Sequence, residues 1–104
     1  MDRPGFVHSV YFWLKEEVSE DQRTAFSQGL QALNNCPTVR HSFIGPSAGT
    51  PREVVDNSYD FALLVFFDNK VDHDAYQEDE IHHEFIDKYK DMWARVQIYD
   101  HLPA

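Results

Sequence analysis

The stretch FVHSVYFWL, residues 6–14, decides the fold, because apolar side chains occupy both faces of this extended segment. Successive residues of a strand point to opposite sides of its sheet. One face therefore carries Phe6, His8, Val10, Phe12 and Leu14, and the other carries Val7, Ser9, Tyr11 and Trp13. A sheet that is apolar on both sides has to be covered on both sides. The helices of a 104-residue chain suffice for one side, so we expect the other side to contact a second copy of the chain.

The segment that follows, residues 19–35, has the pattern of an amphipathic helix. Ser19 is followed three residues later by Gln22, which makes a capping box at a helix N-terminus. The apolar residues that repeat at helical spacing are Phe26, Leu30 and Leu33. Because Pro37 comes soon afterwards, we expect the helix to end near Asn34.

Two further strands are predicted in the middle of the chain. TVRHSFIGPS, residues 38–47, carries β-branched and aromatic residues before a Gly-Pro break. AGTPREVVDN, residues 48–57, is rich in turn formers and predicts a loop. SYDFALLVFFDN, residues 58–69, alternates like the first strand, and both of its faces become apolar toward its end.

The last third of the chain predicts helical structure followed by a strand. We expect a short helical turn at residues 72–75 beside Tyr76, and a longer helix from about Ile81 to Arg95. VQIYDHL, residues 96–102, then forms the last strand. The order β-α-β-β-α-β is that of a ferredoxin-like α+β fold, with an antiparallel sheet and both helices on one face. We expect residues 1–104 to form a single domain.

Composition and charge exclude several classes of partner. Eighteen acidic residues against nine basic ones give a net charge of -9, so nucleic acid and anionic membrane surfaces should be repelled. No apolar run approaches the roughly 20 residues that span a bilayer, and the first residues lack the features of a signal peptide. We therefore expect no membrane association and a cytoplasmic location. Cys36 is the only cysteine, and no Cys/His spacing matches a structural zinc site, so we expect neither a disulfide nor a bound metal.

Two adjacent histidines lie in AYQEDEIHHEFIDKY, residues 75–89, and helical spacing separates them. His82 heads an apolar stripe made of Phe85, Ile86, Tyr89, Trp93 and Val96. His83 is turned about 100° away, in line with polar residues. We therefore expect His82 to be buried against the sheet and His83 to be exposed.

His8 and His82 are candidates for acid–base chemistry, because both are expected in the apolar layer between sheet and helices. A buried histidine is usually neutral and can act as a general base near neutral pH. Tyr76 precedes His82 by six residues, close enough to place its phenol in the same layer. Spacing alone leaves a second interpretation open, in which both histidines are structural core residues and Tyr76 is an aromatic plug.

Several pieces of the chain together resemble the stress-responsive A/B barrel domain family, often shortened to Dabb. They are HSVYFWLK near the N-terminus, the capped first helix, SYDFALLVFF, the pattern Y-x5-H-x2-F that begins at Tyr76, and MWARVQIYDH. The resemblance covers essentially the whole chain. It implies a ferredoxin-like subunit whose sheet faces that of a twin, so that a homodimer forms an α+β barrel.

The resemblance also implies a site. A few plant members of this family are polyketide cyclases that need no cofactor and use a tyrosine and two histidines between sheet and helices. By position, these catalytic residues are His8, Tyr76 and His82 here, with no organic cofactor and a small apolar or polyketide-like ligand. The chain departs from the common H-P-x-H run, since Asp79 and Glu80 replace its first histidine and its proline. The acidic residues 78–80 could orient His82, bind a divalent cation, or favour the positive N-terminus of a helix.

Three functions remain open at this point. The first is a small-molecule enzyme without organic cofactor, in which His82 is a general base acting on an enolisable carbonyl. The second is a noncatalytic dimeric stress-response or small-molecule-binding module. The third is a haem-degrading or quinol-type monooxygenase of the wider dimeric barrel superfamily, which would depend on the tryptophan and histidine content. It ranks last, because a fold alone does not establish a function.

Overall fold

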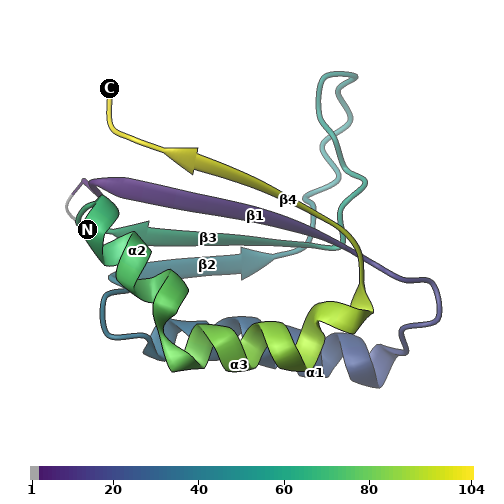
Figure 1. Ribbon diagram of the computed structural model, residues 1–104. Helices are drawn as coiled ribbons and strands as arrows, with labels where there is room; N and C mark the ends of the chain where they lie inside the picture. The colour runs from purple at the N-terminus through teal and green to yellow at the C-terminus, as the bar shows by residue number, and fades with distance from the viewer. Residues whose placement is uncertain (1–2) are drawn as a thin grey trace.

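A computed structural model describes residues 3–104, and its strands form one antiparallel sheet. In the order in which they lie side by side, the strands are β2 (His41–Gly45), β3 (Phe61–Phe67), β1 (Phe6–Leu14) and β4 (Trp93–His101). The two longest strands, β1 and β4, pair over nearly their whole length. Because β3 pairs with the other edge of β1, β1 lies inside the sheet (Figure 1). This is the predicted ferredoxin-like α+β arrangement.

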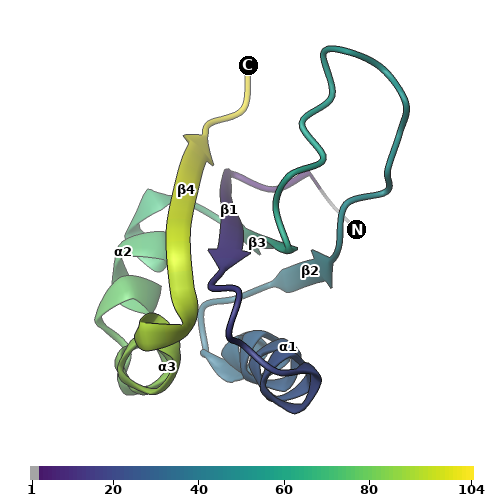
Figure 2. The same cartoon turned by 90° about the vertical axis from the view of Figure 1, so that its right-hand side faces the viewer.

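The helices all lie on one face of the sheet, and the other face is left open (Figures 1 and 2). They are α1 (Glu20–Ala32), α2 (Lys70–Glu78) and α3 (Glu80–Tyr89), with short 3-10 helices η1 (Leu33–Asn35) and η2 (Lys90–Met92). Within residues 3–104 no helix is both long and apolar enough to cross a membrane. The loop between β2 and β3 rises on the side of the open face (Figure 1).

The first helix begins as the sequence predicts. The Ser19 side chain accepts a hydrogen bond from the Gln22 backbone N–H, and the Gln22 side chain accepts one from the Ser19 backbone N–H. Phe26 and Leu30 then point into the core and are fully buried. The capping box and the apolar spacing are therefore confirmed, and η1 ends the segment one residue beyond the predicted Asn34.

The core lies between the helices and the inner face of the sheet. It contains the predicted inner residues of β1 together with Leu63, Val65 and Phe67 of β3. The helices α1 and α3 approach each other at Gly29, where an added methyl group would come within 2.3 Å of the Tyr89 ring. The Tyr89 hydroxyl donates a hydrogen bond to the Ala25 carbonyl oxygen at 3.1 Å. A glycine is thus needed at position 29 for this close packing.

The helical connection after β3 differs from the prediction. The segment around Tyr76 is not a short turn but the nine-residue helix α2, which Asn69 caps by accepting from the Asp72 backbone N–H. Asp79 is extended, with φ −68° and ψ 142°, and it ends α2 and begins α3. The sequence pattern missed α2 because its exposed face is acidic and its apolar residues are few.

The predicted extension of the second long helix to Arg95 is wrong. The α-helix ends at Tyr89, and Trp93 already has the extended geometry of β4, with φ −88° and ψ 127°. Trp93 pairs with Leu14 of β1, and Lys15 donates its backbone N–H to the Met92 carbonyl oxygen. Helical spacing continues through these residues, but pairing with the central strand overrides it. The last strand therefore starts three residues before the predicted Val96.

Candidate functional site

A cavity of about 350 Å³ lies between the inner face of the sheet and the helices α2 and α3. Its walls are apolar except for the side chains of His8, Tyr76, Gln77 and His82 and the indole of Trp93. A concave apolar pocket with a few convergent polar groups is the usual form of a small-molecule site.

The three residues predicted as a site all line this cavity. His8 comes from β1, Tyr76 from α2 and His82 from the first turn of α3. The centre of the Tyr76 ring lies 4.8 Å from that of His82 and 6.0 Å from that of His8. The phenol ring therefore lies close to both imidazoles. Separate elements bring the three together, although two of them are only six residues apart in sequence.

His8 is oriented by a carboxylate on the neighbouring strand. Asp100 is its register partner on β4, and the His8 Nδ1 lies 2.5 Å from an Asp100 carboxylate oxygen. A carboxylate only accepts hydrogen bonds, so the proton belongs on Nδ1 and Nε2 carries the lone pair. Burial lowers the pKa of His8, and the hydrogen bond and charge of Asp100 oppose this effect. Since the net shift is downward, His8 is neutral near neutral pH.

His82 is half-buried, whereas the side chain of His83 is 58% exposed. The predicted phase of the helix is therefore correct, although His82 is less deeply buried than expected. Burial lowers the pKa of His82, and the neighbouring imidazoles of His8, His83 and His73 lower it further. Its Nδ1 is enclosed and has no hydrogen-bond partner among residues 3–104.

Tyr76 is 1% exposed, and burial raises the pKa of its phenol. It therefore keeps its proton and is a hydrogen-bond donor at any ordinary pH. Cys36 is also fully buried, and burial raises the pKa of its thiol to about 11. A thiol with this pKa is a poor nucleophile, so Cys36 is a packing residue.

The acidic residues before α3 act on the helix itself. Asp79 accepts a hydrogen bond from the Ile81 backbone N–H at 2.8 Å, which is the role of an N-cap. Glu80 lies in the first turn, where a negative charge is favourable. A carboxylate oxygen of Glu78 is 4.0 Å from His83. The interpretation based on the helix N-terminus therefore holds for this run, and among residues 3–104 no carboxylate hydrogen-bonds to His82.

Two residues near the site were missed by the sequence analysis. Asp100 is 92 residues from His8 in sequence, and only the register of their two strands connects them. His73 is buried on α2, with its ring centre 4.9 Å from that of His8. A signal for His73 existed, because His73 and Tyr76 are three residues apart and share a face of any helix through them. It was overlooked because α2 was predicted as a turn.

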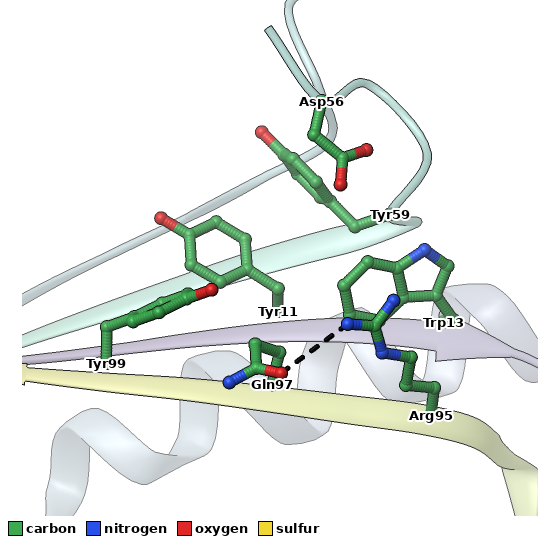
Figure 3. Close-up of a pocket in the computed structure, with 7 residues that line it drawn as sticks. All are labelled: Tyr11, Trp13, Asp56, Tyr59, Arg95, Gln97 and Tyr99. Carbon is green, nitrogen blue, oxygen red and sulfur yellow. Dashed lines mark hydrogen bonds between the residues drawn. The ribbon is translucent and has the colours of Figure 1, made fainter. Parts of the chain in front are cut away.

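A second hollow, of about 320 Å³, lies on the open face of the sheet (Figure 3). It is lined by Tyr11, Trp13, Asp56, Tyr59, Arg95, Gln97 and Tyr99. The Arg95 guanidinium lies 4.3 Å from the centre of the Trp13 ring and donates a long hydrogen bond to Gln97. None of the predicted site residues lies here. This is the face that the sequence predicts to contact a second copy of the chain.

Solved structures with the same fold were found at low sequence identity. A dimeric ferredoxin-like protein of unknown function from Thermobifida fusca is 22% identical, with a TM-score of 0.80 over 96% of this chain and 92% of that one. The hydroxynitrile lyase from Passiflora edulis is 17% identical, with a TM-score of 0.84 over 98% and 96%. A Dabb family protein from Mesorhizobium loti is 18% identical, with a TM-score of 0.78 over 95% and 96%. At these identities the likeness shows the fold alone.

The sequence itself identifies the family. No curated protein matches this chain. The model of the stress responsive A/B barrel domain, however, matches residues 6–102, from the first residue of β1 to just beyond the end of β4. That range contains every element of the fold and all three predicted site residues. The chain therefore belongs to the stress responsive A/B barrel domain (Dabb) family.

Proposed function

We propose that this protein is a cofactor-independent enzyme that removes a proton from the carbon beside a carbonyl group of a small apolar, polyketide-like molecule. The observation that carries the proposal is the placement of two imidazoles of lowered pKa close to a protonated phenol in one apolar cavity. Titratable groups with perturbed pKa values in a pocket are typical of catalytic sites.

His82 is the proposed general base. Its lowered pKa keeps the imidazole neutral near pH 7, and its ring lies at the cavity wall with no carboxylate partner among residues 3–104. A neutral imidazole accepts a proton from an acidic C–H bond, and the electron pair of that bond moves toward the carbonyl oxygen. An enolate and an imidazolium are the products of this step.

Tyr76 is the proposed donor to the carbonyl oxygen. Its phenol is protonated, and its ring contacts that of His82 edge-on, so both groups can reach one small ligand. A hydrogen bond to an oxygen on which negative charge develops is worth more in a site that excludes water. Tyr76 would therefore stabilise the enolate that His82 generates.

His8, which also lies beside Tyr76, is the proposed second acid–base group. Asp100 holds its Nδ1, so Nε2 is the nitrogen available for proton exchange. In a cyclisation, one group must remove a proton and another must return one to an oxygen. Two separate imidazoles allow both transfers without diffusion of a proton through the apolar cavity.

We further propose that the active form is a homodimer. Its support is the aromatic open face of the sheet and the dimeric state of the Thermobifida fusca neighbour. The cavity itself lies within one subunit, between that subunit's own sheet and helices.

A noncatalytic binding module is the second candidate. One observation favours it: His82 lacks the carboxylate that orients His8, so its tautomer is not fixed by any residue in the range 3–104. Such a module would use the same cavity and bind the same apolar molecules without changing them.

Proton–deuterium exchange tests the proposal without knowledge of the natural substrate. Benzoylacetone and related 1,3-diketones are incubated in heavy water with the protein, and loss of the proton between the carbonyls is followed by NMR. Wild type should accelerate the exchange, and His82→Gln should slow it by about 10²–10⁴-fold, the usual contribution of a general base. His83→Gln is the matched control, because it changes the adjacent exposed imidazole and should leave the rate unchanged.

The outcomes separate the two candidates. Equal rates for wild type and His82→Gln would remove His82 from the mechanism. Diketone binding by calorimetry without any acceleration of exchange would favour the binding module. Circular dichroism of each variant establishes that it is folded.

A further inference from the structure

A second cluster of groups lies beside the cavity and shares His8 and its partner Asp100 with the proposed reaction. His73 of α2 is 9% exposed, stacks on Phe6 with ring centres 4.4 Å apart, and lies next to His8. Asp100 completes the cluster from β4, with a side chain that is 43% exposed. Two buried imidazoles and a solvent-accessible carboxylate therefore meet at one end of the sheet.

We propose that His8, His73 and Asp100 bind a divalent transition metal ion of the zinc class. One ligand atom from each residue lies within 4.8 Å of the others. Two imidazoles and one carboxylate suit zinc, cobalt, nickel or ferrous iron, whereas magnesium and calcium prefer sites made only of oxygen. Three protein ligands leave at least one position for water.

The geometry needs only a small adjustment to close around an ion. Ligand atoms at zinc bond lengths lie about 3.4 Å apart in a tetrahedral site. The His8 Nδ1 and the Asp100 oxygen, 2.5 Å apart, must open slightly, the ion must displace the Nδ1 proton, and ligand atoms as far apart as 4.8 Å must come closer together. Asp100 is half-exposed, so its carboxylate has room to turn toward the ion. Its exposure also provides a path by which a hydrated ion can enter.

The surroundings of His73 resemble the outer partners of a metal-binding histidine. An Asp74 carboxylate oxygen lies 3.1 Å from the His73 Nδ1, and Lys70 binds the other Asp74 oxygen at 2.8 Å. A carboxylate on one ring nitrogen fixes the tautomer and leaves the other nitrogen, Nε2, able to coordinate. The Gln77 amide nitrogen is 3.4 Å from Nε2, which is a long contact that an ion could replace.

The metal site shares His8 with the proposed reaction and is otherwise separate from it. An ion bound there would take His8 out of proton exchange, whereas His82 and Tyr76 would remain at the cavity wall. Sequence spacing gives no sign of the cluster, because its members are 65 and 27 residues apart (73 − 8 and 100 − 73) on three different elements. The packing of α2 on β1 and the pairing of β1 with β4 bring them together.

Calorimetric titration of chelator-treated protein with zinc chloride tests the proposal. Wild type should bind one ion per chain, and His73→Phe, which keeps an aromatic ring on Phe6, should abolish that binding. Asp74→Asn should weaken it by about 10–100-fold, as expected for loss of an outer partner. His83→Gln is the matched control, because it removes an exposed imidazole on the neighbouring helix and should bind as wild type does.

Two results would overturn the proposal. One is the absence of a stoichiometric zinc site in wild type. The other is a site that survives in His73→Phe or disappears in His83→Gln, which would place the ion elsewhere. If His73→Phe does not fold, Asp100→Asn replaces it and should likewise abolish zinc binding. The Asp100 side chain is half-exposed, so loss of its charge should not disturb the core. Either result leaves the exchange assay on His82 unaffected, so failure of the metal site and failure of the proposed reaction are distinguishable.

Discussion

The two faces of the sheet use the same alternating strands but differ in what covers them. The inner face packs against α1, α2 and α3, and its β1 residues are at most 9% exposed. The open face leaves Phe43 and Tyr99 more than half exposed and contains the hollow around Arg95. The two histidines whose pKa burial lowers, His8 and His82, both lie on the covered side, and that side holds the candidate site.

The chemistry of the two faces follows from this difference. On the inner face, His8, Tyr76 and His82 are surrounded by apolar walls, where uncharged imidazoles and a protonated phenol are favoured. On the open face, Arg95 lies over Trp13 in a solvated hollow, which is an arrangement suited to contact with another surface. The covered face is suited to proton transfer, and the open face to association.

The largest expected effect comes from two neighbouring leucines of β3 that point to opposite faces. Leu63 is 2% exposed on the inner face, whereas Leu64 is partly exposed on the open face. Leu63→Ala should lower the free energy of unfolding by about 2–5 kcal/mol, because it leaves a cavity in the core. Leu64→Ala should cost a dilute monomer about 1 kcal/mol or less. Urea denaturation measures both.

Protein concentration sharpens this comparison. If the open face is a dimer interface, the cost of Leu64→Ala should grow with concentration, and that of Leu63→Ala should stay nearly constant. Equal and concentration-independent costs at both positions would show that the open face is not covered by a second copy.

The next effect concerns association itself. Tyr11 lies near the middle of the open face and contacts Tyr59 and Tyr99. Tyr11→Glu would place an unpaired charge in the interface, so we expect dimer affinity to fall by about 2 kcal/mol or more, roughly 30-fold, while the monomer stays folded. Sedimentation equilibrium at micromolar concentrations measures this change. A wild type that sediments as a stable monomer would refute the dimer directly.

The smallest effect is the dependence of stability on pH through His82. Its pKa in the folded protein is below the ordinary value of 6.5. Above pH 6.5 the group is neutral in both states and does not alter stability. Below pH 6.5 the unfolded chain takes up a proton that the folded protein resists, so the free energy of unfolding falls as the pH falls. Denaturation at pH 7.5 and 5.5 measures the loss.

His82→Gln should reduce this loss, because it removes one group whose protonation opposes folding. His83→Gln is again the control and should keep the wild-type difference between the two pH values. An undiminished loss in His82→Gln would mean that the half-buried imidazole is better solvated than the structure indicates.

Much of the fold could be predicted from local pattern. The alternation in residues 6–14 gave the first strand with its correct bounds, and the capping box at Ser19 placed the start of α1. The face of α3 was also predictable, since His82 and His83 differ in exposure as helical spacing requires. These features depend on neighbours within a few residues, which the sequence displays directly.

The tertiary structure decided the remainder. The end of α3 depends on the pairing of Trp93 with Leu14, and no helical periodicity can reveal competition from a strand 79 residues away (93 − 14). The carboxylate of His8 is Asp100 because β1 and β4 pair in that register. The neighbouring imidazole is His73 because α2 packs on the end of β1. Local sequence determined which residues could do chemistry, whereas long-range pairing and burial decided which of them meet and how easily each is protonated.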